Sequence, residues 1–199
     1  VLDTPRLDLV FWDGRRFEGE LSAVDSRRDL ALIRLVPQKR DGETNATDFP
    51  HFDLSRETAV VEPGARILAF SNVFRVAAGD EPVSVMRGII AAKTPLEARR
   101  GRTEISFSGP VYLLDTITNN SGAAGGVVVT PRGKLVGVIG KELRNSQSNT
   151  FVNYAMPIDS LAPAVKQLLA GGEAPALDLD EPGVGGRKNR VTSLELGIV

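Results

Sequence analysis

The stretch Asn119-Asn120-Ser121-Gly122-Ala123-Ala124-Gly125-Gly126-Val127 contains five consecutive residues, Gly122 to Gly126, with no side chain larger than a methyl group. It stands directly before the apolar run Val127–Val129, which has the composition of a strand. Glycine permits positive φ angles, and small neighbours let backbone amides turn toward one point. The stretch therefore predicts a strand-entry loop. That loop is either a tight turn without a ligand or a nest of amides that binds a negatively charged oxygen.

The bulk composition is that of an ordinary globular protein and excludes several classes of function. The 199 residues are 42% hydrophobic and 25% charged, with a net charge of −1. A balance this close to neutral gives no sign of the basic surface that binds nucleic acid. No apolar run reaches the roughly 18 residues of a membrane span. The absence of cysteine rules out disulfides and thiol catalysis, and the single His51 argues against a metal site.

Most of the chain has the pattern of short strands separated by glycine and proline turns. Asp13-Gly14 predicts a two-residue hairpin, and only Ile158–Ala170 has helical spacing, with Pro163 in its first turn. This pattern predicts an all-β barrel or sandwich with a C-terminal helix. The expected strands are 7–11, 16–21, 30–35, 59–61, 66–70, 84–92, 104–107, 111–113, 127–129, 134–139 and 151–155.

Several segments along almost the whole chain resemble, in order, motifs of the HtrA (DegP) type of trypsin-like serine proteases. The small-residue loop and the following Arg132–Gly137 are similar to the nucleophile region of that family, G-N-S-G-G-P-L-V followed by G-x-V-x-G. The other matching segments are Arg28–Ile33, Gly64–Asn72, Arg87–Ala92 and Asn153–Asp159.

The resemblance implies a chymotrypsin-like double β-barrel whose first barrel is incomplete in this chain, with the active site between the barrels. It assigns the catalytic aspartate to Asp29 and the nucleophile position to Ala124. An oxyanion hole is expected from the backbone of Gly122, Ala123 and Ala124, which agrees with the composition of the loop. The residues expected to bind substrate, in part by strand addition, are Thr118, Asn119, Asn153, Tyr154 and Ala155.

The catalytic residues depart from the family pattern. Ala124 has no hydroxyl, and the family's histidine would fall just before Val1. Ser121 lies three positions before Ala124, and His51 follows Asp29 in the chain, so neither fits the family's order. Ala124 is either an engineered replacement of serine or the natural residue of an inactive protease. Ala123 and Val127, which stand where the family has asparagine and proline, favour the second explanation.

Three functions remain open on the sequence: a serine endopeptidase domain that is inactive with Ala124, a natural pseudoprotease that binds peptides or unfolded chains, and a structural assembly domain. The resemblance implies a peptide or unfolded-protein partner, no metal or cofactor, a possible homotrimer, and a location in the periplasm or cell envelope. Residues 1–171 are expected to form the protease domain, 172–190 a linker, and 191–199 the start of a possible PDZ domain.

Overall fold

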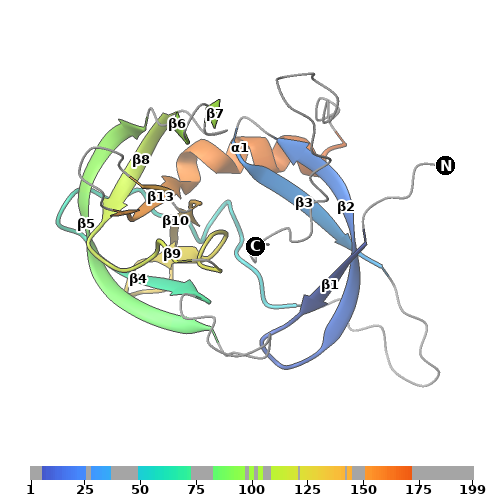
Figure 1. The fold of residues 1–199 in the computed structure, drawn as a ribbon. Coiled ribbons are helices and arrows are strands. Elements are labelled where there is room, and N and C mark those ends of the chain that lie inside the picture. Colours follow the sequence, from blue (N-terminus) through green and yellow to red (C-terminus); the bar gives the residue numbers. More distant parts are fainter. Residues whose placement is uncertain are drawn as a thin grey trace.

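The computed structural model describes residues 6–25, 28–36, 49–72, 83–96, 99–100, 103–104, 109–120, 122–141, 143–144 and 151–171. In Figure 1 a three-stranded sheet, drawn in blue, lies beside a closed barrel drawn in green to orange, and one helix crosses between them. The linker and PDZ segments expected at 172–199 lie outside the described residues.

The described elements are mostly short strands. They are β1 (Arg6–Val10), β2 (Arg16–Asp25), β3 (Leu30–Leu35), β4 (Arg66–Ser71), β5 (Ser84–Leu96), β6 (Arg99–Arg100), β7 (Thr103–Glu104), β8 (Gly109–Leu114), β9 (Val127–Val129), β10 (Leu135–Ile139), β11 (Leu143–Arg144), β12 (Phe151–Val152), β13 (Tyr154–Pro157) and α1 (Ile158–Leu169). The expected all-β fold with a C-terminal helix is confirmed.

Strands β1, β2 and β3 form an antiparallel sheet in that order, where the sequence predicts an incomplete first barrel. The loop of the β1–β2 hairpin has three residues and not the expected two. The Phe11 amide donates to the Arg15 carbonyl at 2.9 Å, so the loop consists of residues 12–14. Gly14 ends this loop at φ 81°, a position that glycine adopts without strain. Phe11, Phe17 and Phe49 pack edge and face on one another, with the Arg15 guanidinium 4.5 Å from the Phe49 ring centre.

The closed barrel has the strand order β10-β13-β8-β5-β4-β9. Its interior is filled by alternate residues of these strands, which are the buried side chains Ile67, Ala69, Ile90, Tyr112, Leu114, Val128 and Val136 among others. The expected strand 59–61 is not formed, and a single bridge between Thr58 and Leu135 takes its place. Of the expected strand 104–107, the structure describes only Glu104, in β7.

Helix α1 contacts β2 and β3 on one side and β10 and β13 on the other (Figure 1). Leu161 is completely buried in an apolar cluster that also contains Leu135 and Val138 of the barrel and Leu30 of the sheet. Pro163 is the sixth helical residue and not a first-turn residue, so the Asp159 carbonyl loses its helical amide partner. The helix therefore joins the sheet to the barrel through apolar contact.

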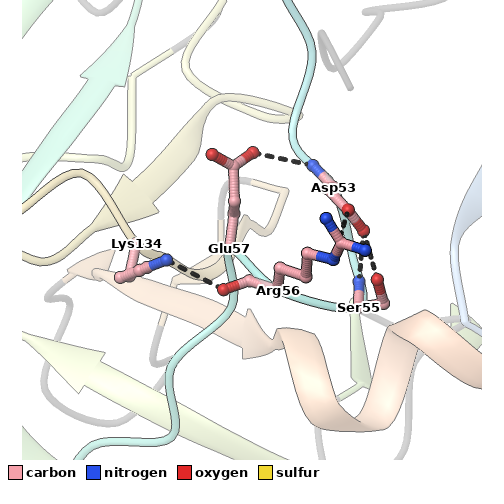
Figure 2. A network of polar contacts seen from close by, with 5 residues as sticks. All are labelled: Asp53, Ser55, Arg56, Glu57 and Lys134. Carbon is pink, nitrogen blue, oxygen red and sulfur yellow. Dashed lines mark hydrogen bonds and ion pairs between the residues drawn. The ribbon is translucent and has the colours of Figure 1, made fainter.

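A connector, residues 49–65, leads from the sheet to the barrel, and Figure 2 shows how it is attached. Asp53 caps a turn by accepting bonds from the Ser55 amide and hydroxyl, and Glu57 accepts the Asp53 amide at 2.8 Å. Lys134 Nζ donates to the Arg56 carbonyl at 2.8 Å, and the Leu135 amide donates to the Glu57 carbonyl at 2.7 Å. These bonds fix the connector to the start of β10.

Candidate functional site

The small-residue loop lies at the entry to β9 and is attached to the end of β10. The Gly125 amide donates to the Ile139 carbonyl at 2.9 Å, and the Ile139 amide donates to the Gly126 carbonyl at 2.7 Å. Gly122 and Gly125 have φ angles of 92° and 83°, which residues with side chains rarely adopt. The loop thus uses its glycines to reverse direction twice between the barrel wall and the strand.

The amides of this loop differ in their partners. The Ala123 amide donates to the Asn120 carbonyl at 3.0 Å, so it has an acceptor inside the loop. Within the described part of the chain, the amides of Gly122 and Ala124 donate to no backbone carbonyl. Free amides on a glycine-rich turn are the donors that an oxyanion hole requires. Gly122 and Ala124 can serve in this way, whereas Ala123 is bonded internally.

Gly126 and Ala123 hold the loop against the barrel. A Cβ atom at Gly126 would lie 2.6 Å from Ser71 Cβ and closer still to the Phe70 carbonyl oxygen, so only glycine fits against β4. The Ala123 side chain is fully buried in the barrel cluster beside Ala69 and Val128. A methyl group suits this buried, apolar position.

Ala124 lines a cleft of about 540 Å³ that follows β9 from the loop toward the β9–β10 turn. The volume lies within the range of ligand pockets, roughly 300–1,000 Å³. Phe52 of the connector and Phe70 of β4 contribute large apolar side chains to it. The residues that line the cleft are Phe52, Phe70, Ser71, Asn72, Val83, Gly122, Ala124, Gly125, Gly126, Val127, Val129 and Gly133.

Asp29 lies in the turn before β3 and faces the barrel. Its φ of 52° is the one positive value among the described residues other than glycine, and aspartate is among the few residues that adopt it readily. Its Oδ1 is 2.6 Å from Nζ of Lys141, which follows β10. Asp29 and Lys141 are 112 positions apart in the chain, so the contact joins the sheet to the barrel.

Tyr154 lies under this ion pair. Burial raises the pKa of its hydroxyl to about 12, with a further contribution from the negative charge of Asp29, while a hydrogen bond from the Lys141 amide acts in the opposite direction. The ring packs on Gly140, where a Cβ would lie 2.6 Å from the Tyr154 hydroxyl oxygen and closer still to the ring carbons. Tyr154 is thus a buried residue, 3% exposed, that supports the Gly140-Lys141 backbone.

The other expected substrate-binding residues form a support behind the loop. The Thr118 amide donates to Asn153 Oδ1 at 2.8 Å, and the Asn153 carbonyl accepts the Leu114 amide at 2.9 Å. Ala155 is paired with Tyr112 of β8 and with Ile139 of β10. Strand addition requires an unpaired edge, which Ala155 does not offer. Thr118, Asn119, Asn153, Tyr154 and Ala155 are absent from the lining of the 540 Å³ cleft.

Of the two alternative catalytic residues, the structure describes only His51. His51 is exposed, its Nδ1 lies 2.9 Å from the Phe49 carbonyl oxygen, and it does not line the cleft. Ser121 lies outside the described residues. The expected site residues did not include most of the cleft lining, Phe52 and Ser71 among it, or Lys141, which binds Asp29. No local pattern in the sequence signals that Lys141 pairs with Asp29.

Two further findings concern the described residues alone. They contain no group of three or more histidine, aspartate and glutamate residues placed to hold a metal ion. No helix in the same ranges combines the length and the apolar character that crossing a membrane requires.

Residues 2–138 match the family of the trypsin-like peptidase domain. The chain is 25% identical over 174 residues to a probable serine protease do-like of Buchnera aphidicola subsp. Acyrthosiphon pisum. It is equally similar to a probable periplasmic serine endoprotease DegP-like of Buchnera aphidicola subsp. Schizaphis graminum. These matches cover 87% of this chain and 32% of each relative, so the chain spans about a third of their length.

Two solved structures are similar to the chain with a TM-score of 0.59. One is the MamO protease domain from Magnetospirillum magneticum in its apo form, at 22% identity, covering 82% of this chain and 77% of that one. The other is the HtrA-type protease AlgW with a decapeptide, at 20% identity, covering 86% of this chain and 46% of that one. At these identities the similarity establishes the fold, in agreement with the closed barrel.

Proposed function

We propose that this chain, which belongs to the trypsin-like peptidase domain family, is an HtrA-like serine endopeptidase domain, as its curated Do-like relatives indicate. Because Ala124 stands in place of the nucleophile, the domain binds peptides but does not hydrolyse them. The observation that carries the proposal is the position of Ala124. It lies on a glycine turn with free amides, at a cleft large enough for a peptide side chain, and has no hydroxyl.

The loss of activity follows from the chemistry of acyl transfer. A serine protease needs a hydroxyl, a base that takes its proton, and amides that stabilise the oxyanion. Here the loop retains amides at Gly122 and Ala124, but the hydroxyl is missing and Asp29 is bonded to Lys141. Loss of one triad member lowers turnover by roughly 10⁴- to 10⁶-fold. Peptide binding does not need the hydroxyl and would remain.

A peptide partner is supported by the cleft and by one relative. AlgW has been solved with a decapeptide, and its protease domain shares this fold. In the present chain the cleft is lined by apolar side chains and by glycine backbone, which suits an extended peptide segment or an unfolded chain. We extend the proposal to a periplasmic or cell-envelope location, a possible homotrimer, a linker at 172–190 and a PDZ domain beginning at 191–199.

A natural pseudoprotease is the second candidate, and the burial of Ala123 favours it. The family pattern has asparagine at this position, yet Ala123 is fully buried among apolar side chains. A single engineered exchange at position 124 would not explain this second adaptation. The residue encoded at position 124 in the native gene distinguishes the two candidates, since serine there would identify Ala124 as an engineered change.

Hydrolysis and binding are measured on the same sample to test the proposal. Casein with a fluorescent label should give no detectable turnover, whereas labelled decapeptides should bind in a fluorescence anisotropy titration. Phe52→Ser, which removes an aromatic wall of the cleft, should weaken that binding, and Arg34→Met, on the distant sheet, should not. Casein turnover that disappears in Asp29→Asn would refute the absence of hydrolysis, and equal peptide binding by both variants would refute the assignment of the cleft.

A further inference from the structure

We propose that the ion pair between Asp29 and Lys141 ties the three-stranded sheet to the closed barrel. The geometry of the contact is the starting point. The Lys141 ammonium is 2.6 Å from Asp29 Oδ1, and the two residues come from different halves of the fold. This inference does not depend on whether the cleft binds peptides.

Lys141 is held in place by its own backbone. The Gly140 amide donates to the Tyr154 carbonyl at 3.1 Å, which fixes the backbone next to Lys141. The close packing of Tyr154 on Gly140 leaves the backbone no room to shift toward the ring. The ammonium group therefore extends toward Asp29 from a fixed point two residues beyond Ile139, which itself anchors the small-residue loop.

Asp29 is held from the other side of the contact. It precedes Leu30, whose side chain packs in the apolar cluster shared by the sheet, the barrel and α1. The neighbouring Arg28 guanidinium is 2.6 Å from Asp25, so it pairs with that carboxylate. Among the described residues, Lys141 is the cation that pairs with Asp29. The ion pair thus lies at the rim of the apolar contact between the two halves.

Lys141 occupies one oxygen of the Asp29 carboxylate. A triad aspartate accepts a hydrogen bond from the imidazole Nδ1–H, and it needs an unoccupied oxygen that faces the cleft. The Lys141 ammonium donates to Oδ1 of Asp29, and its positive charge lowers the attraction of this carboxylate for a second cation. Asp29 keeps the family's residue type at this position but acts here as a link between the two halves.

Thiol labelling can measure how firmly the sheet is held against the barrel. Because the sequence has no cysteine, a single introduced cysteine is the one thiol that reacts. Val138→Cys places a thiol in the apolar cluster on which Leu30 of the sheet packs. Val128→Cys places one in the barrel interior, which opens only when the barrel itself unfolds. Labelling under conditions of rapid opening and closing reports the equilibrium constant for exposure of each site.

Asp29→Asn and Lys141→Met should each increase the labelling rate at position 138 by about two- to fivefold, the range expected for a largely exposed ion pair. Asparagine tolerates the positive φ of Asp29, so the turn is preserved. Lys141→Arg should restore the slow rate. Arg34→Met, which breaks the Arg34–Glu20 pair inside the sheet, is the matched control and should leave the rate unchanged.

Salt gives an independent check, because screening weakens an exposed ion pair. At about 1 M salt the wild-type rate at position 138 should approach that of Lys141→Met, whose own rate should change little. Unchanged labelling at position 138 in both variants would overturn the inference. An equal increase at position 128 would also overturn it, since the variants would then destabilise the barrel and not its contact with the sheet.

Discussion

Replacing Gly126 by alanine tests the close contact between the small-residue loop and β4. The added Cβ would meet Ser71 Cβ at 2.6 Å and the Phe70 carbonyl oxygen at a still shorter distance. Optimal carbon contacts are about 3.5 Å or longer, so loop and strand must separate by about 1 Å. Because one of the contacting atoms is backbone, a change of rotamer cannot relieve the clash.

We expect Gly126→Ala to lower the free energy of unfolding by about 2–3 kcal/mol, the upper part of the range for overpacked sites. Urea unfolding followed by circular dichroism measures this loss. Tryptophan fluorescence would not, because Trp12, the single tryptophan, is 77% exposed on the hairpin of the other sheet.

Gly133→Ala is the matched control for Gly126→Ala. Gly133 has a φ of 77° but open space around its Cβ position, so the substitution introduces backbone strain without a clash. That strain costs roughly 1–2 kcal/mol for a single residue. If Gly126→Ala is no more destabilising than Gly133→Ala, the contact between the loop and β4 is not as close as described, and the argument for the shape of the cleft fails.

Three further outcomes are expected. The Tyr154 hydroxyl has a pKa of about 12, above the unfolded value of 10.0. Its contribution to the free energy of unfolding is therefore complete below pH 10 and is lost as the pH rises to 12. Urea unfolding should therefore show a loss of about 2–3 kcal/mol between pH 10 and 12 that is absent in Tyr154→Phe; parallel curves would contradict the assigned pKa. Ala124→Ser alone should leave casein turnover undetectable, because His51, the single histidine of the sequence, does not line the cleft; activity in a protease assay would refute this expectation. Asp53→Ala should cost about 1 kcal/mol in urea unfolding through loss of the cap on Ser55, whereas Asp53→Asn should retain most of it.

The strands of the barrel were predictable because each carries its own pattern. Leu135–Ile139 is a short apolar run between polar turns, and the structure buries all five residues as β10. The hairpin after β1 was misjudged by one residue. Asp13-Gly14 fits either a two- or a three-residue loop, and the pairing of Phe11 with Arg15 decides between them. That pairing depends on register, which composition does not specify.

The site was predictable where one segment supplies it and not where several do. The loop from Gly122 to Gly126 could be recognised from its small residues and its family pattern. Tyr154 was assigned to peptide pairing, but a strand's sequence does not say whether its edges are free, and this tyrosine is buried beneath Lys141. The Asp29–Lys141 contact joins two halves of the fold, so it depends on their packing and has no local signature.

The connector, residues 49–65, is attached to the sheet at Phe49 and to the barrel at Phe52. Phe49 stacks on Phe11 of the hairpin, with ring centres 4.5 Å apart, whereas Phe52 packs in the cluster of the barrel. Only Pro50 and His51 lie between these two anchors. The attachment to the sheet and the attachment to the barrel are therefore separated by a single dipeptide. Proline fixes one of its φ angles, which stiffens this link between the two halves.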